Sequence, residues 1–310
     1  MSKEKSPRNK TIVVTAEEAA HYSKDFIEAK ENEPLPLDKI TDKILFGYSE
    51  DFIIELPDKC VDLLFLDPPY NLNKTLAGYK FHQSSLWVYQ SRLQGQLGAL
   101  CRVLKPTASI YICGDWHSIA SIHYAAESLS LKVHNIITWE REKGRGAKAN
   151  WKNCSEQILF ATMSDNYTFN VDAVKTKKKV IAPYKVDGKP KDWEETPEGN
   201  FRMSYPSNLW TDLTVPYWSM KENCGHPHQK PEKLLARIIL ASTNPGDLIL
   251  DPYMGSGTAC VVASKLDRRY VGIEKIQEYA CVAAKRLEMA KEDKSIQGYK
   301  DGLFLPRNSK

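Results

Sequence analysis

The sequence lacks any apolar run long enough to span a membrane, and residues 1–5 lead into no hydrophobic signal segment. We therefore expect no membrane association and a cytoplasmic location. Paired cysteines are missing too. The seven cysteines are scattered without a Cys-x-x-Cys pair, which is typical of reduced thiols in a cytosolic protein. Hydrophobic residues make up 42% of the 310 residues, which is enough to build a core.

A complete set of metal ligands is also missing. Cys224, His226 and His228 are close in the sequence, and a zinc site there is the alternative. Structural zinc takes four ligands, however, and no fourth candidate lies nearby. We predict no bound metal.

Acidic residues are scarce in one segment. The chain carries +4 overall, but residues 141–185 hold ten basic and four acidic residues, a net of +6 that leaves −2 for the rest. A basic face on a slightly acidic body is typical of a protein that binds a polyanion. A solvated lysine-rich loop is the alternative for residues 177–179. The candidate contacts are Arg145, Lys148, Lys152, Lys177 and Lys178.

Short apolar runs alternate with segments of helical periodicity, which predicts an α/β fold with a mostly parallel sheet covered on both faces. The expected strands are 43–47, 61–66, 109–114, 133–139, 156–161, one beginning at 247, and 270–273. The expected helices are 16–30, one over 93–104 that ends at Lys105-Pro106, 118–129, one beginning at 231, and one that ends near 291. Residues 71–86 have no clear period and predict a loop that could cover a site.

The strand over residues 61–66 ends in Asp67-Pro68-Pro69-Tyr70. Proline cannot donate to a sheet, so the chain must leave the sheet here, at the strand end where open α/β sheets bind ligands. The carboxylate of Asp67 and the carbonyl of Pro68 could accept hydrogen bonds from an exocyclic amine of a base. The ring of Tyr70 could stack on that base. A carboxylate that merely caps a turn is the alternative.

A second strand, over residues 247–251, leads into Gly255-Ser256-Gly257 at the start of a helix, and the next strand ends on Glu274. Glycines let the backbone approach a ligand closely, and an acid at the next strand end can bind both ribose hydroxyls. The turn has neither a third glycine nor a phosphate-binding lysine, which favours a nucleoside ligand. A tight structural turn is the alternative.

The order of Asp67-Pro68-Pro69-Tyr70, His226-Pro227-His228-Gln229-Lys230-Pro231 and residues 251–258 resembles the permuted β group of amino-directed DNA methyltransferases. The resemblance covers roughly residues 43–290 and implies a Rossmann-like fold with a seven-stranded sheet and S-adenosylmethionine as methyl donor. Two positions depart from the family pattern: Tyr48 stands where an acid is common, and His228 where threonine is. The resemblance implies that Asp67, Pro68 and Tyr70 are catalytic, and that the donor is held by Asp251, Tyr253, Gly255, Gly257, Thr258, Glu274 and Lys230.

The resemblance also implies a division of the chain. We predict an N-terminal extension (1–40), a catalytic half (41–167), an inserted target-recognition region (168–223), a cofactor half (224–292) and a loose C-terminal tail (293–310). Five prolines and dense aromatic residues in 168–223 predict a recognition surface rather than a sheet.

The predicted activity is sequence-specific methylation of double-stranded DNA at the N6 amine of adenine, as in a restriction-modification system. Methylation of cytosine N4 is the first alternative. Another acceptor, such as a protein glutamine or an RNA base, and a non-catalytic nucleic-acid-binding module are the others. None of the cysteines follows a proline, the context that methylation at carbon 5 requires. A cognate restriction endonuclease and a homodimer stay open as partners.

Overall fold

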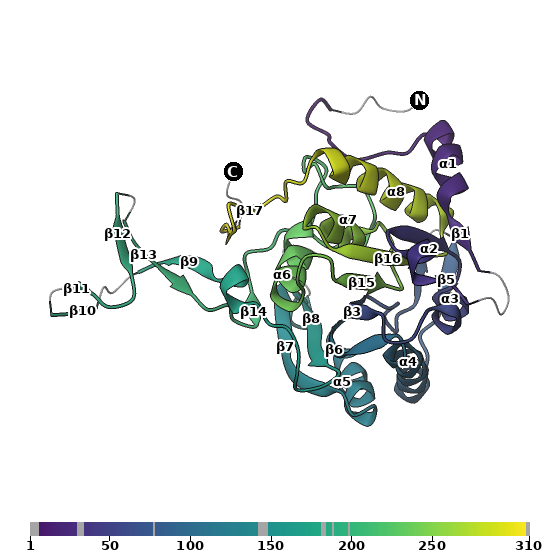
Figure 1. Cartoon of the computed structure of the whole chain (residues 1–310), viewed down its shortest axis with the longest axis horizontal. Coiled ribbons are helices and arrows are strands. Elements are labelled where there is room, and N and C mark those ends of the chain that lie inside the picture. Colours follow the sequence, from purple (N-terminus) through teal and green to yellow (C-terminus); the bar gives the residue numbers. More distant parts are fainter. Residues whose placement is uncertain are drawn as a thin grey trace.

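The computed structural model describes residues 6–29, 34–76, 78–141, 148–180, 184–187, 189–197 and 199–307. Within them, nine strands form one sheet in the order β1-β2-β16-β15-β3-β6-β8-β7-β14 (Figure 1). All neighbours are parallel except β8, which runs antiparallel to β6 and β7. The bounds are β1 Ile27–Glu28, β2 Lys43–Phe46, β3 Val61–Leu66, β6 Leu104–Gly114, β7 Lys132–Glu140, β8 Ser155–Thr162, β14 Leu209–Trp210, β15 Leu248–Asp251 and β16 Arg269–Glu274.

The sheet agrees with the predicted α/β class and differs from it at the edges. The apolar runs predicted seven of these strands, which are, in their order across the sheet, β2, β16, β15, β3, β6, β8 and β7. The two further strands, β1 and β14, are two-residue additions, one at each edge. They come from the predicted extension and the predicted insert, so both of these segments contribute to the main sheet.

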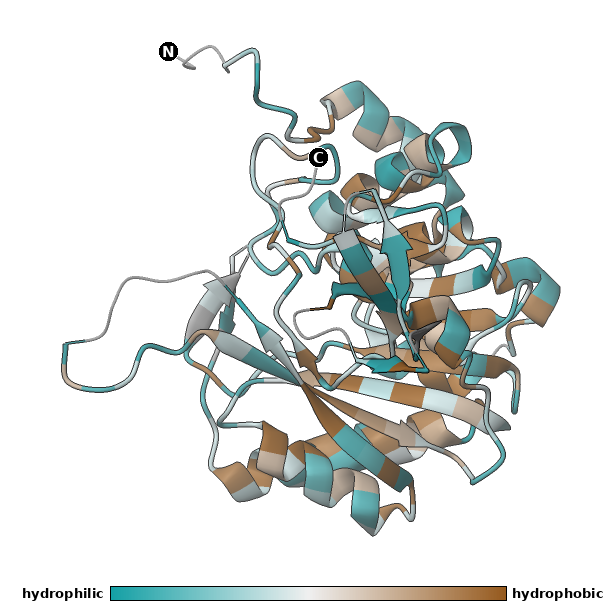
Figure 2. Ribbon diagram, turned by 90° about the vertical axis from the view of Figure 1, so that its left-hand side faces the viewer, coloured by the Kyte–Doolittle hydropathy of each residue, from teal (hydrophilic) through white to brown (hydrophobic). Residues whose placement is uncertain are grey.

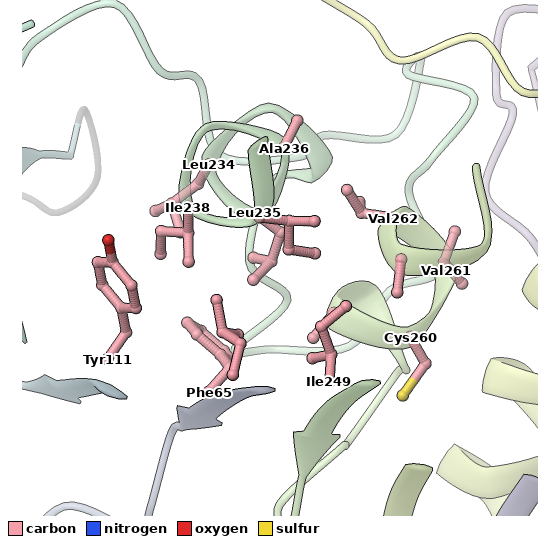
Figure 3. Close-up of a cluster of buried hydrophobic side chains, with 14 of the residues drawn as sticks. Phe65, Tyr111, Leu234, Leu235, Ala236, Ile238, Ile249, Cys260, Val261 and Val262 are labelled. Carbon is pink, nitrogen blue, oxygen red and sulfur yellow. The ribbon is translucent and has the colours of Figure 1, made fainter. Parts of the chain in front are cut away.

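Helices cover both faces of the sheet because the central strands are apolar on both sides (Figure 2). Leu63 and Phe65 of β3 pack in one core cluster, and Leu64 and Leu66 pack in the other. The first cluster is covered by α6 (Glu232–Ser242), α7 (Thr258–Lys265) and α8 (Gln277–Glu292), and the second by α2 (Leu37–Ile40), α3 (Ser49–Glu55), α4 (Leu86–Cys101) and α5 (Ile119–Ser128). Figure 3 shows side chains of α6 and α7 above Phe65 and Ile249.

The strand order brings the two predicted halves of the domain together. β3 pairs with β6 on one side and with β15 on the other, so the segment after Asp67 and the glycine turn after Asp251 leave the same edge of the sheet. The chain continues from β3 to β6 in one direction across the sheet and from β15 to β16 in the other. Open α/β sheets form ligand sites where the direction of connection changes in this way.

Two local expectations were wrong. The helix predicted over residues 16–30 ends earlier: α1 spans Ala16–Tyr22, a 3-10 turn covers Ser23–Asp25, and the chain then extends into β1. Pro106 was expected to stop a helix, but α4 ends at Cys101 and Pro106 lies inside β6. The pairing of β6 with β3 shifts register between Val61 and Leu63, so no ladder bond is required of Pro106.

The prediction that residues 168–223 form no sheet was also wrong. After a 3-10 turn over Val171–Val174, strands β9 (Thr176–Lys179), β12 (Glu194–Thr196) and β13 (Gly199–Ser204) form an antiparallel sheet, and β10 (Lys185–Val186) pairs with β11 (Lys189–Pro190). These strands project from the body of the protein (Figure 1). The prolines interrupt the segment, but β9 and β13 still pair because each is a short extended run between them.

Neither end of the described chain is loose. The C-terminal strands β17 (Tyr299–Lys300) and β18 (Leu303–Phe304) form a hairpin that buries Phe304, so the expectation of a loose tail was wrong. Near the N-terminus, the amide of Lys10 donates to the carbonyl of Trp218 at 2.7 Å, and α1 packs on α8. None of the described helices is both long and apolar enough to cross a membrane.

Candidate active site

A pocket of about 450 Å³ opens at the carboxyl ends of β2, β3, β15 and β16. Each strand contributes the residues that directly follow it. These are residues 47–50 after β2, 67–72 after β3, and 252, 253 and 255 after β15, together with 273–276 at the end of β16. The two sequence motifs therefore line one pocket, as the parallel strand order requires.

Both carboxylate oxygens of Asp67 already have a hydrogen-bond donor. The hydroxyl of Tyr70 donates to Oδ1 at 3.0 Å, and the ammonium of Lys230 donates to Oδ2 at 2.5 Å. Burial, together with the nearby Asp67, raises the pKa of Tyr70 well above its ordinary value, so the phenol keeps its proton. The two donors fix the orientation of the carboxylate.

Glu274 ties the end of β16 to the glycine turn. Its Oε2 accepts the amide N–H of Gly255 and its Oε1 accepts that of Ile276, both at 2.8 Å. Burial raises the pKa of Glu274 and these backbone hydrogen bonds oppose that rise. Each oxygen keeps lone-pair capacity for a further donor, such as a ribose hydroxyl.

The glycines have different reasons for their identity. Gly255 lines the pocket with φ +54°, and a Cβ there would lie 3.4 Å from the ring of His226. Gly257 lies behind the pocket with φ +77°, and a Cβ there would stand 2.6 Å from the Cβ of Ala283 in α8. One glycine therefore leaves room for a ligand, and the other lets α8 pack against the turn.

Of the other residues predicted to hold the donor, Tyr253 lines the pocket, whereas Asp251 and Thr258 lie behind it. Asp251 is buried behind it, where its Oδ1 accepts the amide N–H of Tyr253 at 3.2 Å. Thr258 begins α7, and its hydroxyl accepts a hydrogen bond from the buried Arg286 at 2.9 Å. Asp251 and Thr258 thus shape the turn.

The segment before α6 covers one side of the pocket. His226 lines it with its ring against Tyr279, at 4.3 Å between ring centroids. Burial, with His228 nearby, lowers the pKa of His226 to about 4, so its imidazole is neutral near pH 7. The thiol of Cys224 donates to the side-chain oxygen of Gln229 at 3.1 Å. No group of three potential metal ligands gathers among the described residues.

The loop expected over 71–86 contains a short hairpin, β4 (Lys74–Leu76) with β5 (Tyr79–Phe81). Its base is closed by the side chain of Asn71, which donates to the carbonyl of Ser84 at 2.9 Å and accepts its amide N–H at 2.8 Å. Asn71, Leu72 and His82 line the pocket, so the residues on either side of this hairpin form one wall.

Four of the predicted DNA contacts lie in the part of the chain that the structure describes, and none of these four lines the pocket. Lys177 and Lys178 are exposed on β9, and the ammonium of Lys177 lies 4.5 Å from the ring centroid of Phe201 on β13. Lys148 and Lys152 are exposed in the segment that leads to β8. Arg145 lies outside the described residues.

Several pocket residues were not predicted. Tyr48 lines the pocket from the end of β2, and the ammonium of Lys275 lies 4.7 Å from its ring centroid. Its strand-end position was the available signal, although the residue is not an acid. Arg92 and Gln96 line it from α4, four positions apart on one side of that helix. Nothing local in the sequence identifies Tyr279.

The fold and the pocket together define an α/β protein with a pocket at the carboxyl ends of its central strands, lined by the carboxylates of Asp67 and Glu274. The sequence model of the N6/N4 methyltransferase family, described as DNA methylase, matches residues 61–285. This chain belongs to that family. It is therefore a DNA methyltransferase, a class in which S-adenosylmethionine supplies the methyl group.

The chain is similar to two curated proteins over most of its length. It is 34% identical over 243 residues to DNA adenine methyltransferase YhdJ of Escherichia coli K12, and the matched region covers 76% of this chain and 79% of that protein. It is 34% identical over 235 residues to type II methyltransferase M.HpaI of Haemophilus parainfluenzae, which covers 75% and 70%. The solved complex of M1.HpyAVI with SAM has the same fold, with a TM-score of 0.56, 23% identity, and coverage of 79% of this chain and 98% of that one.

Proposed function

We propose that this protein transfers a methyl group from S-adenosylmethionine to the N6 amine of adenine at a specific site in double-stranded DNA. The observation that carries the proposal is the meeting of Asp67 and Glu274 in one pocket, each at the carboxyl end of its strand. One carboxylate suits an amine acceptor and the other suits the ribose of a donor.

In this proposal the pocket holds the donor through Glu274, Tyr253 and the turn at Gly255. Glu274 accepts hydrogen bonds from ribose hydroxyls through the lone pairs that its backbone contacts leave free. The missing Cβ of Gly255 leaves room beside His226 for a ligand. A neutral imidazole there does not repel a sulfonium cation.

Asp67, Pro68 and Tyr70 act on the acceptor. The amine lone pair of adenine is delocalised into the ring, which makes the nitrogen a weak nucleophile. Hydrogen bonds from its two hydrogens to the carboxylate of Asp67 and the carbonyl of Pro68 draw the nitrogen towards tetrahedral geometry. Such bonds strengthen as the transition state is approached, and the reactants are already aligned. Tyr70 supplies a face on which a base taken out of the duplex stacks.

Adenine is favoured over cytosine by three observations. Aspartate at position 67 accompanies adenine methylation in the family that the sequence resembles, whereas serine there accompanies cytosine methylation. Adenine also offers more area for stacking on Tyr70. YhdJ, at 34% identity, is a DNA adenine methyltransferase. Cytosine N4 presents the same two hydrogens to Asp67, so it is the alternative.

The projecting strands β9 to β13 are proposed to read the target sequence. They carry exposed lysines beside aromatic rings, as in the pair Lys177 and Phe201, and such side chains suit contact with bases and phosphates. Lys148 and Lys152 are proposed to bind the DNA backbone without regard to sequence. Residues 168–223 would then be the target-recognition region, inserted between the catalytic and cofactor halves.

We further propose that the protein is the modification enzyme of a restriction-modification system. The similarity to the type II methyltransferase M.HpaI supports this role. The partner would be an endonuclease that cuts the same site when it is unmethylated. The homodimer stays a prediction, which sedimentation of the purified protein at several concentrations tests.

Methylome sequencing tests the proposal. DNA from cells that express the protein should carry N6-methyladenine at one recurring sequence, and DNA from cells that express Asp67→Ala should not. Labelled methyl transfer to purified DNA separates an enzyme from a module that only binds. Tight DNA binding by the wild-type protein without any methyl transfer would contradict the proposal.

A further inference from the structure

Lys230 joins the half-buried carboxylate of Asp67 to the buried carboxylate of Glu156. Its ammonium donates to Oδ2 of Asp67 at 2.5 Å and lies 3.5 Å from Oε2 of Glu156 on β8. The side chains are 6%, 17% and 5% exposed for Lys230, Asp67 and Glu156. Arg141, just beyond the end of β7, pairs with the other oxygen of Glu156. Two anions and two cations therefore form a chain from the catalytic strand end to the neighbouring strands.

Lys230 compensates the negative charge of both Asp67 and Glu156. Among the described residues, Oε2 of Glu156 has no hydrogen-bond donor, so the ammonium of Lys230 is its nearest compensation. Burial alone would lower the pKa of Lys230, but Asp67 and Glu156 outweigh it and hold the pKa above the ordinary value. The amine is therefore charged at neutral pH.

We infer that Lys230 is a positioning residue for Asp67 and does not hold the donor. This inference rests on the proposed function and changes one role within it, because the sequence resemblance places Lys230 among the residues that hold the donor. Lys230 lies behind the carboxylate and is not among the residues that line the pocket.

The geometry explains how Lys230 would help. A carboxylate oxygen has two lone-pair sites, so Oδ2 can hold the ammonium and still accept a hydrogen of the target amine. With Tyr70 on Oδ1, the carboxylate cannot rotate freely. Removing Lys230 leaves the half-buried carboxylate of Asp67 close to the buried one of Glu156, and like charges at this range cannot both stay ionised at low cost. One carboxylate then takes up a proton, and if that is Asp67, the amine loses its acceptor.

Lys230→Met tests the inference, because methionine keeps the length of the side chain without its charge. Lys233→Met is the matched control. Lys233 is a buried lysine three positions after Lys230, in the first turn of α6. It pairs with Asp212 at 2.8 Å and does not line the pocket. The wild type, both variants and Lys230→Met/Glu156→Gln are assayed with tritiated S-adenosylmethionine and unmethylated genomic DNA of mixed sequence. Donor Kd is measured by calorimetry.

We expect Lys230→Met to lower kcat about 100-fold with donor Kd within about threefold, since chemistry and not donor binding depends on Asp67. Lys233→Met should keep kcat within about twofold. The double variant removes one of the two competing carboxylates, so its kcat should exceed that of Lys230→Met about tenfold. It also removes the uncompensated charge, so it remains informative if Lys230→Met does not fold. In that case its kcat should still lie about tenfold below that of the wild type.

Three results would overturn the inference. The first is a kcat of Lys230→Met, or of the double variant where the single one does not fold, equal to that of the wild type. The second is a donor Kd that rises as much as kcat/KM falls, which would place Lys230 on the donor. The third is a double variant no faster than a folded Lys230→Met. Wild-type protein that methylates no DNA would instead refute the proposed function.

Discussion

Replacing Glu274 by alanine tests the donor half of the site. In the free protein the carboxylate holds two backbone amides at 2.8 Å and keeps lone pairs for two ribose hydroxyls. Losing two charge-assisted hydrogen bonds to the donor costs about 2–3 kcal/mol, which is roughly a 30- to 150-fold rise in donor Kd. We therefore expect Glu274→Ala to bind S-adenosylmethionine one to two decades more weakly.

Calorimetric titration at pH 7.5 measures this change. Glu278→Ala is the control, because Glu278 is an exposed acid one turn further along that does not line the pocket. It should keep donor Kd within about threefold. Melting curves of both variants show whether the turn at Gly255 survives without its tie. A folded Glu274→Ala protein with wild-type donor Kd would refute the ribose role and the placement of the donor.

The pH dependence of donor binding adds a second readout of the same carboxylate. Burial raises the pKa of Glu274, and only its ionised form accepts a hydrogen bond at both oxygens. Donor affinity should therefore be constant above neutral pH and fall as the pH is lowered through the pKa of Glu274. This fall should be absent in Glu274→Gln.

The remaining predictions concern chemistry, DNA and stability. Asp67→Ala should lower kcat at least 100-fold in the methyl-transfer assay with donor Kd within about threefold, and loss of donor binding by the folded variant would contradict its role. Replacing residues 176–204 by a short linker should abolish site preference in methylome sequencing while donor Kd stays unchanged. Lys148→Ala/Lys152→Ala should flatten the slope of log Kd for DNA against log salt by about 2, and an unchanged slope would exclude phosphate contacts. His226 has a folded pKa of about 4 against 6.5 unfolded, so below pH 6.5 protonation favours the unfolded chain. The free energy of unfolding of the wild type should therefore fall by about 2 kcal/mol more than that of His226→Gln when the pH is lowered from 7 to 5. An equal fall in both proteins, measured by denaturant titration, would contradict this.

The sheet and both motifs could be predicted because their signals are local. An apolar run that stops at Asp67-Pro68 identifies a buried strand end, and a strand that leads into Gly255 identifies a turn with special backbone geometry. Parallel strands then place these ends along one edge without any knowledge of the side-chain contacts.

What the sequence could not predict depends on partners far along the chain. Lys230 contacts Asp67 across 163 positions, and Glu156 is the second residue of β8, with no pattern that relates it to either residue. Pro106 follows the helix-stop rule locally, but a register shift in the pairing of β6 with β3 leaves it unpaired inside β6. The pairing of β9 with β13 likewise joins runs more than twenty residues apart.

Mass spectrometry of nucleosides tests the central claim most directly. Unmethylated DNA is incubated with the purified protein and S-adenosylmethionine, digested to nucleosides and compared with a reaction that contains Asp67→Ala. We predict N6-methyladenine in the wild-type reaction and no methylated nucleoside with the variant. The appearance of N4-methylcytosine without N6-methyladenine would contradict the account.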